Sequence, residues 1–310
     1  MTIMKIKHIF SLAALAVMTA ACSSEDLTQQ PASKIGQTLP FRATISAYAG
    51  TRGLIEAADG KSITAKWEVT EKIALVHSRL DDAKKPIVDV MEVKYVESNT
   101  GNACIEGTIN NYVEGETVYL VYTGHNEMSM NDYPGVIENA LANSQPEPTA
   151  ITQEMIIGSF SIPREGTLAD INDCSDYRLG ISTLTKMTGT EYVTFGSDAP
   201  TLSSQFAMWK LTLTTDGTTA LEASQLYITC GGKTYTIDPT GDTTLSTFYV
   251  LLPASTNATY KFKATDGTNT YIVTYSGVTL AAAKFYCSTL TLKPATGTND
   301  YNIVTTVQEW

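Results

Sequence analysis

Short runs of alternating apolar and polar residues, separated by turn residues, constrain the fold of this 310-residue chain more than any other feature. Between residues 39 and 48 the alternation has the two-residue period of a half-buried strand. The apolar face of this segment consists of Phe41, Ala43, Ile45 and Ala47. Similar runs, with Gly, Asn and Asp turns between them, recur at residues 73–76, 93–96, 103–109, 117–122, 206–213, 226–229, 234–237, 248–252, 260–264, 271–275 and 285–292. This rhythm predicts an all-β protein.

The N-terminus has the features of an export signal. Lys5 and Lys7 precede a short apolar run, and small residues then lead to Cys22. The apolar run has about half of the roughly 20 residues that a membrane-spanning helix needs, so we expect residues 1–21 to be a cleaved lipoprotein signal peptide. Cys22 would then become the lipidated, palmitate-bearing N-terminus. Thr19 stands where such signals usually have leucine, and the alternative is an ordinary secretory signal in which Cys22 occurs by chance.

The four residues that follow Cys22 indicate where the exported protein is located. Ser23-Ser24-Glu25-Asp26 resembles the acidic signal that sends lipoproteins of the Bacteroidales to the outer face of the outer membrane. The resemblance implies a cell-surface protein that is tethered to the outer membrane by acyl chains. Each buried methylene of such an anchor contributes about 0.8 kcal/mol to membrane binding.

The charge of the chain limits its partners. The full sequence carries a net charge of −11, and the predicted mature chain, without Lys5 and Lys7, carries −13. An acidic chain of this kind repels nucleic acid and anionic lipid headgroups. We therefore exclude nucleic acid as a partner.

Turn-rich and polar stretches divide the chain into predicted parts. Residues 22–38 are polar and aperiodic, as expected of a tether between lipid and fold. A breaker-rich stretch at 196–204 predicts a boundary between an N-terminal β-sandwich domain, 39–200, and a C-terminal one, 201–293. The remaining residues, 294–310, form a separate tail after the second domain.

The cysteines and histidines give little sign of a metal or redox site. Besides Cys22, the chain has four isolated cysteines, and its histidines lack a second ligand at metal spacing. We expect buried thiols rather than bridges, although an export compartment permits disulfides. No metal and no cofactor is predicted. The four cysteines are Cys104, Cys174, Cys230 and Cys287.

Catalytic motifs are missing from the sequence, which contains no GxSxG, HExxH, GxGxxG or CxxC. The run from Gly231 to Thr234 ends like a phosphate-binding loop, but Tyr227 stands where that motif requires glycine, so we predict a β-turn. A serine triad would have to use His77 or His125, the histidines outside the signal. We predict that the chain is not an enzyme.

Two further segments stand out. Arg52 and Gly53 lie in a glycine-flanked turn after the first predicted strand, a typical site for a trypsin-like protease; the alternative is a solvated charge in a turn.

The tail from Asp300 to Trp310 is rich in strand-forming residues and would be an unpaired edge unless it is covered. Its alternative is a last strand packed on its own domain. Tyr301, Ile303, Thr305 and Val307 form one face of this strand, and Val304, Thr306 and Trp310 form the other.

The order and spacing of several segments resemble the fimbrillin, or major-fimbrium-like, family of the Bacteroidales. The segments are 41–45 leading to Arg52, Trp67 followed by 71–75, 248–253, 260–267, and 280–286 followed by 288–292. Two positions depart from the family pattern, because Thr70 and Ala283 stand where relatives commonly have glycine. Glu71 also replaces an aspartate.

The resemblance implies two tandem transthyretin-like β-sandwich domains and a structural role in a type V pilus, or fimbrium, that supports cell adhesion. In the family an arginine-specific protease cuts the loop after the first strand, here between Arg52 and Gly53. The strand at 39–48 then leaves, and the C-terminal strand of another pilin subunit fills the groove by donor-strand exchange. The donor residues would be Tyr301, Ile303, Val304, Val307 and Trp310. The rank of the subunit within a pilus, the adhesive target and the buried face of the donor stay open.

A second hypothesis from a different class is a surface glycan-binding β-sandwich lipoprotein. Trp67, Trp209 and Trp310 could form a stacking platform, although aromatic residues of all-β proteins more often pack in the core. Arg52 favours the pilus subunit, because a glycan-binding protein has no use for a cleavable loop after its first strand.

Overall fold

The computed structural model describes residues 37–46, 55–61, 63–64, 66–124, 133, 135–139, 142, 148–160, 163–174, 176–196, 199–240, 243–295 and 308–309. All of them belong to one of the two units into which the contacts divide the chain, 34–310. Several predicted sites lie outside the described residues: the signal peptide, Cys22, Arg52, Gly53, Tyr301, Ile303, Val304, Val307 and Trp310.

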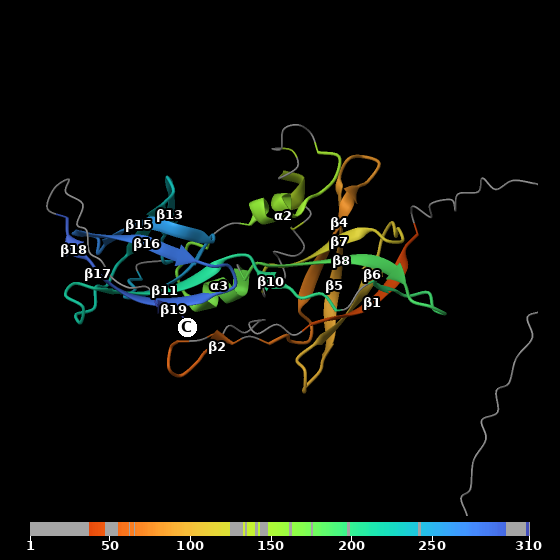
Figure 1. Cartoon of the computed structure of the whole chain (residues 1–310), viewed down its shortest axis with the longest axis horizontal. Coiled ribbons are helices and arrows are strands. Elements are labelled where there is room, and N and C mark those ends of the chain that lie inside the picture. The colour runs from red at the N-terminus through yellow and green to blue at the C-terminus, as the bar shows by residue number, and fades with distance from the viewer. Residues whose placement is uncertain are drawn as a thin grey trace, which may run out of the picture. The chain divides into compact units, whose positions relative to one another are not determined.

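One large sheet contains most strands of the first half of the described chain, and it closes on itself (Figure 1). Its order is β10-β8-β7-β4-β5-β6-β1-β9, and a further pairing of β8 with β9 completes the ring. The bounds are β1 Leu39–Ile45, β4 Lys72–Leu80, β5 Pro86–Val96, β6 Ala103–Ile109, β7 Thr117–Tyr122, β8 Arg178–Lys186, β9 Val193–Phe195 and β10 Ser203–Ser204.

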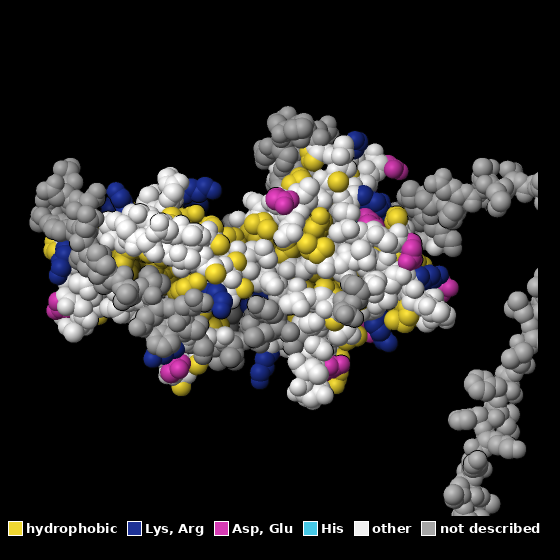
Figure 2. All heavy atoms as spheres, viewed as in Figure 1, with side chains coloured by type: hydrophobic (Ala, Val, Ile, Leu, Met, Phe, Trp, Pro, Cys, Tyr) yellow, Lys and Arg dark blue, Asp and Glu magenta, His cyan; other side chains and the backbone are white. Residues whose placement is uncertain are grey.

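The closed sheet buries residues on both of its faces. Ile73 and Leu75 of β4 belong to the interior core, whereas Ala74 and Val76 belong to a second apolar cluster on the outer face. That outer cluster includes residues of the helix α2, Gln153–Ser159, which begins where the Thr152 side chain accepts a hydrogen bond from the Met155 amide. Figure 2 shows hydrophobic side chains exposed in small patches on the face in view, some of them close to α2.

The second half of the described chain forms two sheets that enclose one core. The four-stranded sheet has the order β14-β11-β17-β19, and the five-stranded sheet has the order β13-β12-β15-β16-β18. Their bounds are β11 Ala207–Thr214, β12 Gln225–Cys230, β13 Lys233–Ile237, β14 Thr247–Leu252, β15 Ser255–Thr265, β16 Thr270–Leu280, β17 Phe285–Thr291, β18 Lys293–Pro294 and β19 Gln308–Glu309. A hairpin of β2, Ile55–Glu56, and β3, Ile63–Thr64, and the helix α3, Leu168–Cys174, complete the described elements with known bounds.

The all-β prediction is confirmed, since strands dominate the described chain and its helices α2 and α3 have seven residues each. None of the described helices is long and apolar enough to cross a membrane. The first sheet differs from the predicted sandwich because it closes on itself. The layout of two transthyretin-like domains, and the boundary between 200 and 201, stay predictions.

The structure also tests the predictions of free thiols and of a turn at Gly231 and Gly232. Cys104, Cys230 and Cys287 are free thiols, as expected, although each is half-buried rather than buried. The side chain of Cys174 is outside the described part. Gly231 and Gly232 form the predicted turn between β12 and β13, with φ of 57° and 79°, values that glycine adopts without strain.

Candidate functional site

The first strand of the closed sheet, β1, is the candidate functional element. Its burial alternates along all seven residues, so that Leu39, Phe41, Ala43 and Ile45 point into the interior core while the residues between them are exposed. Phe41 is 1% exposed and Ile45 is 0% exposed. The predicted strand extended to residue 48, whereas β1 ends at Ile45, and residues 47–50 are not described.

The two neighbours hold β1 very unequally. On one side β1 pairs antiparallel with β6 at seven successive positions, from Leu39 opposite Ile109 to Ile45 opposite Ala103. On the other side it pairs with β9 at one position, Phe41 opposite Val193. Departure of β1 would therefore break the ring at its weakest pairing and leave the whole of β6 as an unpaired edge.

Phe41 occupies a position built for a large side chain. Its ring packs edge-on against Phe195 of β9, with the ring centroids 5.2 Å apart. Directly opposite Phe41 on β6 is Gly107, where an added Cβ would lie 2.6 Å from Met91 Sδ and 2.9 Å from the Val90 carbonyl oxygen. The absence of a side chain at Gly107 thus admits Met91 to the core beside Phe41.

The outer face and the end of β1 carry weaker restraints. Arg42 forms an ion pair with Glu106, at 2.5 Å, and its guanidinium lies over the ring of Tyr192. The hydrogen bond and charge of Glu106 raise the pKa of Arg42, but the Arg42 side chain is 54% exposed, so solvent screens this pair. Just after β1, the Ser46 amide donates to the Pro200 carbonyl oxygen at 3.0 Å.

The chain after the predicted cleavage site is held by a different part of the protein. Glu56 of β2 forms an ion pair with Lys210 of β11, at 2.5 Å, and accepts a hydrogen bond from the Tyr249 hydroxyl of β14. Burial raises the pKa of Glu56, but hydrogen bonds from Lys210 and Tyr249 outweigh it, and the net direction is downward. The Cys287 thiol of β17 also donates to the Gly60 carbonyl oxygen. The hairpin β2–β3 is thus fixed to the four-stranded sheet independently of β1.

Two residues of the predicted donor tail have described backbone. Gln308 and Glu309 form β19, which pairs antiparallel with Cys287 and Tyr286 of β17 at the edge of the four-stranded sheet. This short pairing is the position expected of a last strand on its own domain, the alternative that the sequence left open.

The histidine that the sequence singled out is buried inside the closed sheet. His77 Nδ1 lies 2.9 Å from Glu116 Oε2, and His77 Nε2 lies 3.1 Å from Asp89 Oδ2. Arg79 pairs with the other oxygen of Glu116, and Asn110 donates to Asp89 through both its backbone and its side chain. Because carboxylates occupy both ring nitrogens of a side chain that is 0% exposed, His77 cannot exchange a proton with a substrate in this state. Its role is structural.

Two of the three tryptophans proposed for a glycan platform are core residues. Trp67 is 3% exposed and packs edge-on against Tyr122, and Trp209 is 0% exposed and packs against Tyr260. Both therefore pack in a core, as is more usual for aromatic residues of all-β proteins, and neither is available for the alternative of an exposed platform. Trp310 is outside the described residues.

Thr70 and Ala283, the two residues that replace a customary glycine of the resemblance, both have left-handed backbone. Their φ values are 80° and 60°, in the region that glycine enters freely and other residues enter at a cost of about 1–2 kcal/mol. The backbone at these positions is therefore the one that glycine would favour, although the residue has changed.

Ala283→Gly is expected to raise the free energy of unfolding by about 0.5–1 kcal/mol. Glycine relieves the strain of the left-handed backbone, and this gain is partly offset because glycine increases the conformational entropy of the unfolded chain. Ala282→Gly is the matched control, because residue 282 does not have positive φ. It should lower stability by a similar amount. Urea unfolding of the two variants measures both effects, and equal losses in the two would contradict the role of the backbone at 283.

Sequence reasoning missed the clamp of Glu56, Lys210 and Tyr249 and the closure of the first sheet. Nothing local marks Glu56, which lies 154 residues from Lys210 along the chain. The burial of His77 between two acids was also missed, although its place on an apolar strand was a usable signal.

Comparisons with known proteins give distant likenesses. No protein-family model and no curated protein matches the sequence. A fimbrial assembly protein from Parabacteroides distasonis is similar in structure at 9% identity and a TM-score of 0.36, covering 82% of this chain and 91% of that one.

Two proteins described as putative cell adhesion proteins are similar at the same level. The one from Bacteroides ovatus has 11% identity and a TM-score of 0.37, covering 89% of this chain and 96% of its own. The one from Bacteroides fragilis has 12% identity and a TM-score of 0.38, covering 88% and 97%. These values are too low for any residue of this chain to take a role from those proteins.

Proposed function

We propose that the chain is a structural subunit of a type V pilus of the fimbrillin kind, exported as a surface lipoprotein on Cys22 and assembled by donor-strand exchange. An arginine-specific protease cuts between Arg52 and Gly53, β1 leaves, and the tail strand of another subunit takes its place. The proposal rests most on one observation. β1 fills the interior core with four side chains, yet it is joined to β9 at a single position.

The energetics favour replacement of β1 over an empty groove. Large apolar side chains such as Phe41 and Ile45 contribute about 1.5–3 kcal/mol each when they are buried. Their loss would expose both that apolar surface and the seven-residue edge of β6. An incoming strand restores backbone pairing and core filling together, and its alternating side chains select the partner.

The remainder of the subunit is arranged to survive the cut. The hairpin that begins two residues beyond Gly53 is clamped to the four-stranded sheet through Glu56, so processing at Arg52 need not release the chain that follows. The tail residues Tyr301, Ile303, Val304, Val307 and Trp310 are the proposed donor. Their supply to a neighbour requires that the pairing of β19 with β17 be given up, a cost of two residues of ladder.

Digestion with an arginine-specific protease tests the proposal, because the chain has only five arginines. Three of these, Arg42, Arg79 and Arg178, are ion-paired within strands. We expect the cut at Arg52 to be followed by filaments in electron microscopy. Arg52→Lys should abolish both, because it keeps the charge and removes the protease site. Arg164→Lys is the matched control for the exposed loop arginine, and it should polymerise normally.

A truncated chain that ends at residue 299 belongs in the same experiment. It should be cut at Arg52 and lose β1, yet form no filaments on its own, because it has a groove and no donor. Unfolding of the truncated chain would place the tail in its own sheet and contradict the donor role. Filaments from Arg52→Lys in normal amount would contradict the cleavage step.

A further inference from the structure

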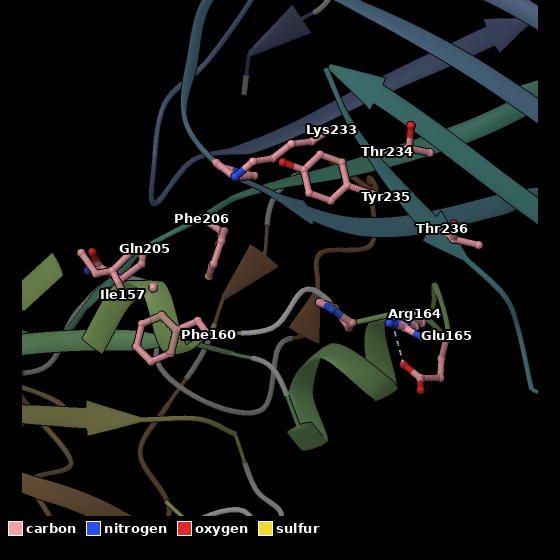
Figure 3. Close-up of a pocket in the computed structure, with 13 residues that line it drawn as sticks. Ile157, Phe160, Arg164, Glu165, Gln205, Phe206, Lys233, Thr234, Tyr235 and Thr236 are labelled. Carbon is pink, nitrogen blue, oxygen red and sulfur yellow. Dashed lines mark hydrogen bonds between the residues drawn. The ribbon is translucent and has the colours of Figure 1, made fainter. Parts of the chain in front are cut away.

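A cavity of about 1010 Å³ lies beside β13, the edge strand of the five-stranded sheet (Figure 3). Its wall includes Lys233 and Tyr235 of β13, Phe160 directly after α2, Arg164, and Phe206 directly before β11. The described residues of its wall include none of β1 or β19. None of the predicted sites accounts for it.

The cavity faces unpaired backbone. β13 pairs with β12 from Lys233 opposite Cys230 to Ile237 opposite Leu226, and it has no second partner among the described strands. Alternate residues of such an edge strand direct their N–H and C=O groups away from the sheet. Just beyond β13, the Asp238 amide donates to the Arg164 carbonyl oxygen at 2.5 Å. Among the described residues, the open edge is thus capped at its C-terminal end and free along 233–236.

Aromatic side chains give the cavity an apolar side. Phe206 is buried, and Phe160 is half-buried and stacked on Tyr177 with a centroid separation of 4.5 Å. Figure 3 shows Phe160 and Phe206 across from Tyr235, which reaches in from the strand. Since Phe160, Phe206 and Tyr177 all contact one another, this side is firm rather than adaptable.

The charges around the cavity favour an acidic occupant. Arg164 and Lys233 are both exposed, and neither has an ion-pair partner in the described part of the chain. Glu165 is the one carboxylate among the described residues of the wall, and it accepts a hydrogen bond from the Arg164 amide at 3.0 Å. These two cations lie beside an open sheet edge on a chain whose net charge is −11. They complement carboxylates on a partner.

We propose that the open edge of β13 is a strand-addition site for an extended, acidic peptide segment of a partner protein. The segment pairs its backbone with residues 233–236, over roughly 13 Å at about 3.3 Å per residue. One row of its side chains enters the cavity against Phe160 and Phe206, and its carboxylates bind Lys233 and Arg164. A free edge recognises backbone amides, which a peptide has and a glycan lacks, so the geometry favours a peptide.

Selection of random octapeptides displayed on phage against the full chain tests this site. Recovered peptides should be rich in Asp and Glu, with apolar residues at alternate positions. A synthetic copy of the best peptide should bind at least tenfold more weakly to Thr234→Pro, which places a proline ring on the strand edge without enlarging the cavity. The charge-reversal variant Lys233→Glu should also lose about tenfold.

The control variant distinguishes binding at β13 from a general attraction of acidic peptides to surface lysines. Lys66→Glu makes the same charge reversal at an exposed residue outside the cavity wall and should bind the peptide as the unmodified chain does. Lys233→Glu keeps the proposal falsifiable if Thr234→Pro does not fold. Peptides without acidic enrichment, or binding that both β13 variants leave unchanged, would overturn the proposal. If oligosaccharides displace the bound peptide and other acidic peptides do not, the cavity is a glycan site and the proposal is wrong.

Discussion

Phe41→Ala is expected to lower the free energy of unfolding of the first core by about 3–5 kcal/mol, the range for truncation of a buried aromatic residue. The loss includes the buried area of the ring, its edge-on contact with Phe195 and the cavity left behind. Because the Phe41 ring contacts Phe195 of β9 next to the single pairing of β1 with β9, the same change removes a side-chain contact between these strands and leaves their backbone pairing. Once the chain is cut at Arg52, β1 should then dissociate much faster than from the unmodified protein.

Phe262→Ala is the matched control, since Phe262 is an equally buried phenylalanine of the second core. It should reduce stability to a similar degree and leave the release of β1 unchanged. Denaturant unfolding measures the stabilities, with Trp67 and Trp209 as fluorescent reporters of the two cores. Size-exclusion chromatography after digestion measures β1 release. Equal release from both variants would show that Phe41 has no special part in retaining the strand.

His77→Leu is expected to lower stability by about 3–5 kcal/mol near pH 6, because it leaves buried carboxylates without their shared partner. Burial lowers the pKa of His77, but the hydrogen bonds and charges of Asp89 and Glu116 outweigh it and hold the pKa above its ordinary value. Asn110 still donates hydrogen bonds to Asp89, and Arg79 remains as the ion-pair partner of Glu116.

The raised pKa of His77 gives this effect a definite pH dependence. The protonated ring stabilises the fold fully below the unfolded pKa of about 6.5, and the stabilisation is lost as the pH rises through the higher folded pKa. The stability difference between the unmodified chain and His77→Gln, which retains an amide donor without a charge, should therefore shrink from about pH 6 to about pH 9. Urea unfolding at the two pH values measures it. A difference that stays constant would mean that the buried ring is neutral.

The β1 segment shows which features the alternation of apolar and polar residues can predict. The two-residue alternation predicted its inward face, and Phe41, Ala43 and Ile45 are indeed buried. The predicted strand included Ser46, which lies just outside β1, because alternation marks strand propensity whereas strand length depends on the partner. The seven-residue ladder with β6 ends opposite Ala103. Sequence could not reveal that this strand closes a ring, since closure depends on β8 meeting β9.

The backbone of Thr70 and Ala283 and the burial of His77 are features that the local sequence could not reveal. Thr70 and Ala283 do not favour positive φ by themselves, and the surrounding turns impose it on them. From the sequence, His77 was a candidate catalytic base. The fold excludes that role, because it places one acid at each ring nitrogen and leaves the side chain 0% exposed.

The sequence by itself determined the all-β class, the inward face of β1 and the glycine turn between β12 and β13, because each depends on side-chain period or backbone freedom within a few residues. Only the tertiary structure decided the closed sheet, the clamp on Glu56, the burial of His77 and the free edge of β13. Those features join residues that are far apart in the chain, and their energies depend on burial and partners that no local pattern encodes.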